Sequence, residues 1–133
     1  MAMVDITVVI VNYNVRSFLD HCLQSVLRAA QNLEVQIIIV DNASTDNTAQ
    51  IVREEFRNRV KLLVRAENSP VAARNQGFWS ARGEFVLSLD HDMVISDARL
   101  LHRAVELFRA YPRVGLLAMN ICGKDEPERA LAK

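Results

Sequence analysis

Apolar residues along the chain follow two alternating patterns. Short continuous runs rich in β-branched residues are typical of strands buried on both faces. Such runs occupy residues 6–11, 35–40, 60–64, 85–89 and 114–119. The segments between the first four runs, and the segment before the fifth, repeat apolar residues at helical spacing instead. The pattern therefore predicts five strands separated by four helices.

The first helix is the clearest of the four. Between the first two strands, apolar residues recur every three or four positions and form a single stripe, which comprises Phe18, Leu19, Cys22, Leu23, Val26, Leu27 and Ala30. A second helix follows residue 45, because Ser44 or Thr45 can accept a hydrogen bond from its first turn.

The third and fourth helices carry signals at their ends. Ser69 followed by Pro70 is typical of a helix start, and Gly83 is a suitable residue to end that helix. Ser96 or Asp97 can begin the fourth helix.

Alternating strands and helices imply βαβ crossovers, and hence a mostly parallel sheet with helices on both faces. We expect an α/β protein with a Rossmann-like, three-layer α/β/α architecture. Residues 1–122 should form one domain, and the polar residues 123–133 should be a tail or the start of a missing C-terminal half.

Composition narrows the class of function. The 133 residues are 50% hydrophobic, with 16 basic and 16 acidic side chains, so charge alone recruits neither nucleic acid nor an anionic membrane. No apolar run is long enough to span a bilayer, and we expect a cytoplasmic protein, with peripheral association at the inner membrane face left open. Cys22 and Cys122 form no CxxC motif, which argues against a zinc site, and Cys22 should be an ordinary core thiol.

Polar residues gather immediately after the predicted strands. In an open parallel sheet, ligands bind at the carboxyl ends of the strands, so these residues should line one rim. They are Asn12, Tyr13 and Asn14 after the first strand, Asp41 and Asn42 after the second, Arg65, Glu67 and Asn68 after the third, and Asp90, His91 and Asp92 after the fourth.

Asp90 and Asp92 are candidate metal ligands. Two carboxylates one residue apart repel each other unless a cation lies near them. Mg²⁺ and Mn²⁺ take oxygen ligands and often need only one or two from the protein when a substrate phosphate supplies others. The alternative is that either aspartate caps the following helix, but Ser96 and Asp97 are better placed for that role.

Other rim residues allow more than one reading. Asp41 can accept a hydrogen bond from a base N–H or a ribose hydroxyl, or it can be a simple turn residue. Arg74 can reach a phosphate or a base, or be an ordinary surface arginine. The sequence pattern favours a structural role for Asp46 in the first helical turn. For His91 it favours a side chain that points away from the metal.

Four segments together resemble the family 2 glycosyltransferases. They are VVIVNYN at residues 8–14, VDNASTD at 40–46, ARNQG at 73–77 and LDHD at 89–92. Each motif is weak by itself, but their order and their positions at strand exits make the resemblance specific over residues 5 to about 95. The resemblance implies a GT-A fold and transfer of a sugar from a nucleotide-diphosphate donor with inversion at the anomeric carbon.

The resemblance also implies roles for individual residues. The nucleoside would be held by Asn12, Tyr13, Asn14 and Asp41. Asp90 would contact the ribose and, with Asp92, coordinate Mn²⁺ or Mg²⁺, while Arg74 would lie near the base and phosphates. Because a carboxylate such as Asp41 can accept from the imino N–H of uracil, thymine or guanine, UDP, dTDP and GDP sugars all remain candidate donors. The acceptor, whether a glycan, a lipid or another molecule, is not identified.

The chain departs from the family pattern after the Asp-x-Asp motif. Only the last 41 residues follow Asp92, whereas family members usually continue and supply the acceptor surface and the catalytic base. Asp125 and Glu126 lie in the polar tail without a matching motif, so no base is assigned. Our hypothesis is that the chain is the donor-binding half of a glycosyltransferase, either truncated or a naturally short member of the family.

Two alternatives come from other classes. The chain can be a non-catalytic nucleotide-sugar-binding module that completes its sheet as a homodimer. Alternatively, residues 89–94 superficially resemble the aspartate-nucleophile motif of haloacid-dehalogenase phosphatases, although that motif normally opens its domain.

Overall fold

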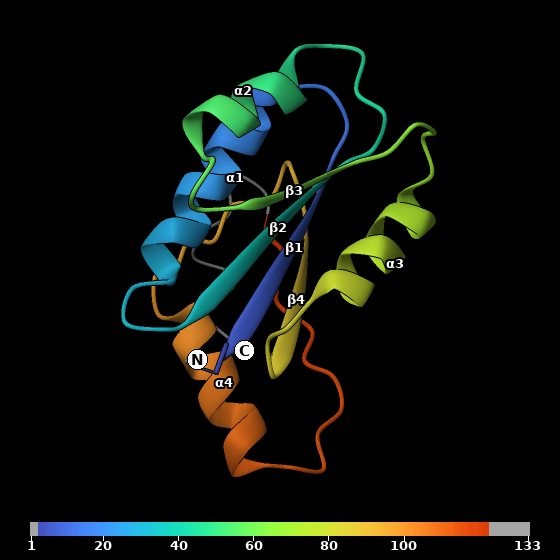
Figure 1. Cartoon of the computed structure of the whole chain (residues 1–133). Helices are drawn as coiled ribbons and strands as arrows, with labels where there is room; N and C mark the ends of the chain where they lie inside the picture. The colour runs from blue at the N-terminus through green and yellow to red at the C-terminus, as the bar shows by residue number, and fades with distance from the viewer. Residues whose placement is uncertain (1–2, 123–133) are drawn as a thin grey trace.

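The computed structural model describes residues 3–122, which alternate strands and helices along the chain. The elements are β1 (Ile6–Asn12), α1 (Arg16–Ala29), β2 (Val35–Asp41), α2 (Thr48–Glu55), β3 (Lys61–Val64), α3 (Pro70–Ser80), β4 (Phe85–Asp90) and α4 (Leu100–Ala110). The strands form one parallel sheet in the order β3-β2-β1-β4, with helices on both faces (Figure 1). The predicted three-layer α/β/α class is confirmed.

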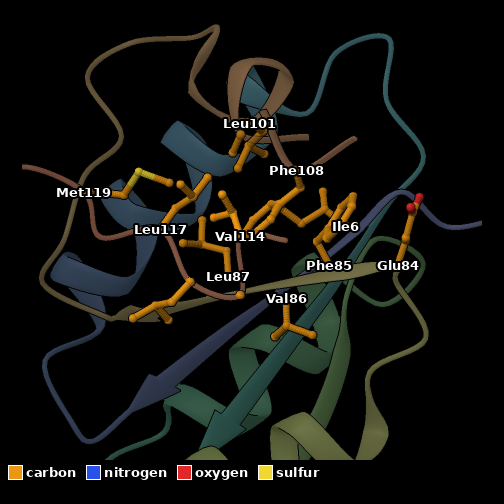
Figure 2. Close-up of a pocket in the computed structure, with 13 residues that line it drawn as sticks. Ile6, Glu84, Phe85, Val86, Leu87, Leu101, Phe108, Val114, Leu117 and Met119 are labelled. Atoms are coloured by element: carbon orange, nitrogen blue, oxygen red, sulfur yellow. The ribbon is translucent and has the colours of Figure 1, made fainter. Parts of the chain in front are cut away.

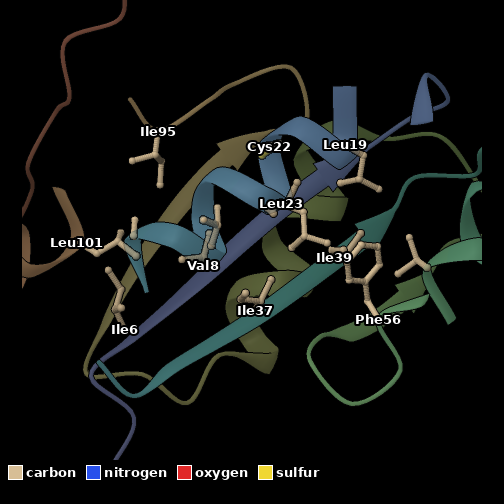
Figure 3. Packing of buried hydrophobic residues seen from close by; sticks show 14 of the residues in the cluster. Ile6, Val8, Leu19, Cys22, Leu23, Ile37, Ile39, Phe56, Ile95 and Leu101 are labelled. Atoms are coloured by element: carbon tan, nitrogen blue, oxygen red, sulfur yellow. The ribbon is translucent and has the colours of Figure 1, made fainter. Parts of the chain in front are cut away.

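The larger apolar cluster lies between the sheet and α1, α2 and α4. β1 and β2 contribute alternate residues to it, and α1 covers them with Leu19, Cys22 and Leu23 (Figure 3). The predicted apolar stripe of the first helix therefore faces this core, with two exceptions. Phe18 is half exposed, and Ala30 lies just past the end of α1, where Ala29 takes its place in the cluster.

α3 packs on the opposite face of the sheet. Val9, Val11, Ile38 and Val40 of β1 and β2 meet Ala73 of α3 in a second cluster. Because every residue of β1 is buried, this strand has no solvated face, as its continuous apolar run predicts.

The small residues of α3 set its distance from the sheet. A Cβ atom on Gly77 would lie 2.3 Å from Cγ1 of Val9, which is closer than atoms can approach without a shift. Gly77 therefore lets the helix backbone approach β1 and brings the side chains of α3 near the strand exits.

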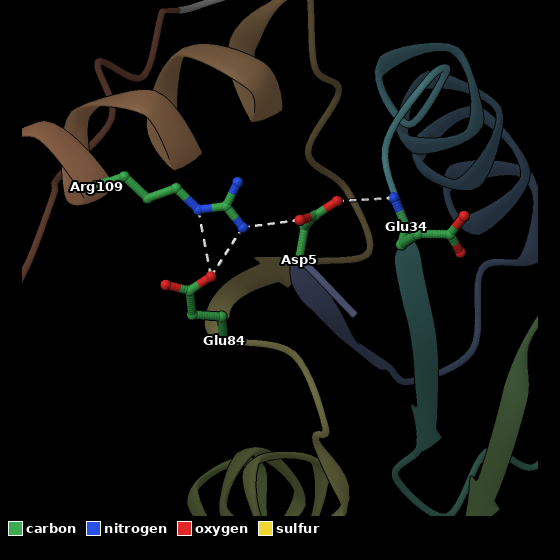
Figure 4. A network of polar contacts seen from close by, with 4 residues as sticks. All are labelled: Asp5, Glu34, Glu84 and Arg109. Carbon is green, nitrogen blue, oxygen red and sulfur yellow. Dashed lines mark hydrogen bonds and ion pairs between the residues drawn. The ribbon is translucent and has the colours of Figure 1, made fainter. Parts of the chain in front are cut away.

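An ionic cluster ties the end of α4 to the amino-terminal edge of the sheet (Figure 4). Nη2 of Arg109 lies 2.8 Å from Oδ1 of Asp5 and 2.8 Å from Oε2 of Glu84. Oδ2 of Asp5 accepts a hydrogen bond from the backbone N–H of Glu34 at 3.0 Å. These bonds hold the pKa of Asp5 below its ordinary value, with the Arg109 hydrogen bond the main cause.

The predicted fifth strand is wrong. Residues 114–119 form no strand; they run beside β4 and α4 with no ladder, and Leu116 is 83% exposed. An apolar run has strand propensity, but it becomes a strand only where a neighbouring backbone supplies hydrogen-bond partners.

Three predicted helix ends also differ from the structure. α3 ends at Ser80, and Gly83 instead lies against β1, where an added Cβ would come within 2.4 Å of the Thr7 nitrogen. α2 begins at Thr48, after Ser44 and Thr45 have bonded to the β1 exit. α4 begins at Leu100, and Oδ1 of Asp97, before the helix, accepts the Arg99 N–H at 2.9 Å. Ser69 and Pro70 begin α3 as predicted.

In the part of the chain that the structure describes, no helix has the length and apolar character required to cross a bilayer. The proposed division at residue 122 falls at the end of the described range, and residues 123–133 lie outside it.

Candidate functional site

The carboxyl ends of β2, β1 and β4 lie side by side, in that order. Asn12 of β1 is in register with Asp41 of β2, and Val11 is in register with Asp90 of β4. The Asn42 N–H donates to the Asn12 carbonyl at 2.8 Å and extends the pairing just past the strands. The fold thus brings the predicted residues of three separate motifs to one rim.

Asp41 is a buried carboxylate held on both oxygens. Its Oδ1 accepts the Ser44 hydroxyl at 2.5 Å and Nδ2 of Asn12 at 3.3 Å, and its Oδ2 accepts the Ser44 backbone N–H at 3.2 Å. Asp41 is 2% exposed and Asn12 is fully buried. Both predicted nucleoside-binding residues are therefore parts of one rigid polar group.

Asn14 joins the same group from the loop after β1. Its backbone N–H donates to Oγ of Ser44 at 2.9 Å, and its side-chain oxygen accepts the Thr45 N–H at 2.9 Å. Asn14, Val15 and Ala43 all have positive φ angles between 51° and 64°, a conformation that costs non-glycine residues energy. The hydrogen bonds hold these two loops in tight left-handed turns at the rim.

A second link runs from β2 to the start of α3. The side chain of Asn42, which is 1% exposed, donates from Nδ2 to Asn68 at 3.1 Å and accepts the Ser69 N–H at 2.9 Å. The rim is thereby connected to the helix that carries Arg74.

Arg74 and Asp90 form an ion pair between α3 and the end of β4, joining Nη2 to Oδ1. Both side chains are partly exposed, so the pair lies at the surface of the rim. The structure therefore places two predicted donor-binding residues in direct contact.

Asp92 lies two residues beyond β4 and is exposed. Within residues 3–122, no group of three or more His, Cys, Asp or Glu side chains is arranged to hold a metal ion by itself. Two hard oxygen donors at Asp90 and Asp92 nevertheless suit Mg²⁺ or Mn²⁺, which keep water and phosphate among their ligands. The donor set therefore fits a metal bound together with a nucleotide diphosphate.

The remaining rim candidates differ in surroundings. Tyr13 is 42% exposed, beside the buried Asn12. The His91 ring lies 6.2 Å from that of Phe18 on α1, centroid to centroid. Oδ1 of Asp46 accepts the Thr48 N–H at 3.0 Å, so its role is structural, but it lies just before α2 and not in the first helical turn as predicted.

Cys22 lies beneath the rim, on α1. Its Sγ is 3.8 Å from the Asp90 carbonyl oxygen, and burial, with smaller contributions from the charges of Asp92 and Asp90, raises the pKa of the thiol to about 12. An uncharged, buried thiol matches the predicted core role.

Sequence analysis missed the role of Ser44 and the link made by Asn42. Ser44 was expected to cap a helix, yet its hydroxyl and its N–H both bind Asp41. The spacing of an aspartate three residues before a serine in a turn is a usable signal, because Asx side chains bond to nearby N–H groups.

A cavity of about 350 Å³ lies away from the rim, between β4, α4 and residues 114–119 (Figure 2). Its lining residues are apolar apart from Glu84 and Gly115, and Glu84 is the charged residue among them. Because it offers no set of donors for phosphates or a base, we assign the polar rim as the candidate site.

A parallel α/β sheet with polar side chains collected at the strand exits has the architecture in which open α/β folds bind their ligands. Comparison with known proteins specifies the family: the profile of Glycosyl transferase family 2 matches residues 7–131. The chain belongs to this family.

Two relatives illustrate the similarity. An uncharacterized glycosyltransferase of Nostoc sp. strain PCC 7120 is 36% identical over 115 residues, which are 84% of this chain and 35% of the relative. The poly(ribitol-phosphate) β-N-acetylglucosaminyltransferase TarS of Staphylococcus aureus is 30% identical over 95% of this chain and 23% of its own length. The chain thus spans about a third or less of these relatives.

Solved structures show the same fold. TarS (residues 1–349) in complex with UDP-GlcNAc superposes with a TM-score of 0.71 and 32% identity, over 81% of this chain and 32% of that one. The mannosyltransferase PcManGT from Pyrobaculum calidifontis, in complex with GDP-Man and Mn²⁺, has a TM-score of 0.79 and 26% identity, over 90% of this chain and 36% of that one. The predicted GT-A type of fold is confirmed.

Proposed function

We propose that this chain is the donor-binding half of an inverting, metal-dependent glycosyltransferase. The observation that carries the proposal is the meeting of Asn12, Asp41, Arg74 and Asp90 at one rim, through the Asn12–Asp41 hydrogen bond and the Arg74–Asp90 ion pair. Family membership and the nucleotide-sugar complexes of two structural neighbours support it.

In this proposal the nucleoside lies over the ends of β1 and β2. Asp41 is an acceptor-only group when ionised, so it suits a base that presents an imino N–H, as uracil, thymine and guanine do. Tyr13 offers a partly exposed ring at the same edge, and Asn12 and Asn14 keep the two loops in place.

The diphosphate lies toward β4 and α3. A divalent cation held by Asp92 and Asp90 would neutralise negative charge that develops on the departing nucleotide diphosphate. Arg74 holds one oxygen of Asp90 and so orients that carboxylate, while Asp92 is exposed. As a fixed cation at the rim, Arg74 also stabilises a phosphate through space.

Calorimetric titration of UDP, dTDP and GDP, each with Mn²⁺, with Mg²⁺ and with chelator, tests the proposal. We expect binding that depends on the metal, and an affinity about tenfold or more lower in Asp92→Asn. Glu106→Gln, which changes an exposed carboxylate on α4, is the matched control and should bind as the unaltered protein does. Equal binding with and without chelator would exclude the metal from the site, and no binding by a folded chain would overturn the donor site.

A further inference from the structure

The hydroxyl group of Ser44 uses its full hydrogen-bonding capacity within the rim. A serine hydroxyl has one donor and two acceptor positions. It donates to Oδ1 of Asp41 at 2.5 Å and accepts the Asn14 backbone N–H at 2.9 Å and Nδ2 of Asn12 at 3.4 Å. One small side chain therefore joins the exits of β1 and β2.

This arrangement restricts how the Asp41 carboxylate can turn. Oδ1 is occupied by Ser44 and Asn12, whereas Oδ2 accepts one bond, from the Ser44 N–H at 3.2 Å. The unused acceptor capacity of the carboxylate therefore lies mainly on Oδ2. Rotation of the group would break bonds to a buried charge, which are among the stronger hydrogen bonds in proteins.

We propose that Ser44 is a positioning residue that fixes Asp41 for selecting bases with an imino N–H. The inference rests on the proposed function, since it assigns Asp41 to the base. A fixed acceptor favours uracil, which has a donor at N3, over cytosine, which has an acceptor there. Ser44 thus contributes to base selectivity without touching the nucleotide.

The experiment compares UDP with CDP by calorimetry at one Mn²⁺ concentration. In Ser44→Ala we expect UDP affinity to fall about tenfold or more, because a hydrogen bond to a charged group is lost, while CDP affinity changes little. Ser44→Thr keeps the hydroxyl and should retain the preference for UDP. Ser88→Ala, which removes an exposed hydroxyl on β4, is the matched control.

Several outcomes overturn the inference. An equal loss of UDP and CDP affinity would indicate general damage to the rim. Unchanged affinities for both nucleotides would show that Asp41 selects the base without Ser44. Loss of the preference in Ser44→Thr would exclude the hydroxyl as the cause. If Ser44→Ala does not fold, Ser44→Cys is the second variant, because it replaces the hydroxyl with a weakly donating thiol. It should show the same loss of preference for UDP over CDP.

A crystal structure of nucleotide-free Ser44→Ala separates this inference from the proposed function. We expect the Asp41 carboxylate to turn and its contact with Asn12 to lengthen. An unmoved carboxylate would overturn the positioning role even if no nucleotide binds. If the unaltered protein binds no nucleotide but the Asp41 carboxylate is displaced in the variant, the proposed donor site is overturned. The positioning of Asp41 by Ser44 then still holds.

Discussion

Asn12 shows how a single buried polar residue serves the site. Its Nδ2 donates to Asp41, while its Oδ1 has no hydrogen-bond partner among the described residues. Reversing the amide would set its oxygen against the carboxylate, so the observed orientation is the better of the two. An unpaired buried acceptor lowers the stability of the fold. The observed orientation of the amide nevertheless supplies a hydrogen-bond donor to Asp41.

Cys22 and Cys122 differ in accessibility and should differ in reactivity. At pH 8 the Cys22 thiol is buried and stays protonated, because its pKa is raised to about 12. We expect a maleimide to label one thiol per native chain, at the exposed Cys122, and two in denaturant, as counted by mass spectrometry. Cys122→Ser should abolish native labelling, and rapid labelling of that variant would contradict the buried position of Cys22.

Among the elements, α3 both packs against the sheet and places Arg74 at the candidate site. Ala73 and Gly77 on the inner face of α3 pack against β1 and β2. Arg74, the residue next to Ala73, forms an ion pair with Asp90. The close approach is needed because a larger inner residue would push the helix outward and carry the guanidinium away from the rim. Core packing and site geometry are therefore set by the same few residues.

Gly77→Ala should destabilise the fold. The added methyl group would overlap Cγ1 of Val9, and overpacking of this kind costs ~1–3 kcal/mol, partly offset by the better helix propensity of alanine. Urea unfolding measures the loss. Gly115→Ala is the control, since an added Cβ there meets no atom within 4 Å. Equal stability of the two variants would show that α3 can move outward without cost.

The junction of α4 with the sheet should depend on pH. Arg109 lowers the pKa of Asp5, so the ionised carboxylate is favoured in the folded state. Its stabilising contribution is fully present above about pH 4, the ordinary aspartate range, and is lost as the pH falls through the lower folded pKa.

We therefore expect Asp5→Asn to unfold at a lower temperature than the unaltered protein at pH 7. The difference should narrow as the medium is acidified below about pH 4, and thermal unfolding over a pH series measures it. Asp20→Asn on α1 removes an exposed i,i+4 ion pair with Arg16 and serves as the control. A difference that grows on acidification would contradict the ionic role of Asp5.

In the whole molecule, the described sheet carries the polar rim at its strand exits and has β4 as one of its edge strands. The outer edge of β4 pairs with no strand within residues 3–122, and an apolar cavity lies beside it. This chain spans 35% of the Nostoc relative and 23% of TarS. This geometry is consistent with a donor half whose acceptor surface is supplied by other residues.

We expect the 133-residue chain by itself to bind nucleotide without transferring sugar. Incubation with UDP-GlcNAc or GDP-mannose, Mn²⁺ and a free sugar acceptor should release no nucleotide above the rate without protein. Calorimetry on the same sample confirms that the site binds, and light scattering determines whether the chain is a monomer or a homodimer. Transfer by a monomer would contradict the half-enzyme proposal.

The class of fold and the residues of the candidate site could be predicted from local sequence alone. Strands buried on both faces need apolar residues on both faces, so the runs at residues 6–11 and 35–40 were visible. The run at 85–89 also forms a strand, but β4 has one solvated face, where Val86 and Ser88 are exposed, so its predicted burial on both faces is wrong. Polar residues directly after such runs must lie at the strand exits, which made Asn12, Asp41 and Asp90 predictable as neighbours. Both inferences depend on local sequence and on the regular geometry of a parallel sheet.

Which side chains bond to one another became clear from the folded structure and not from the sequence. The contacts of Ser44 with Asn12 and Asn14, and of Arg74 with Asp90, join residues distant along the chain and depend on loop conformation and helix position. The tertiary structure likewise decided that residues 114–119 form no strand, because a strand requires a partner backbone as well as suitable side chains. Hydrogen-bond partners and strand partners are properties of the folded arrangement, and local sequence encodes only the capacity for them.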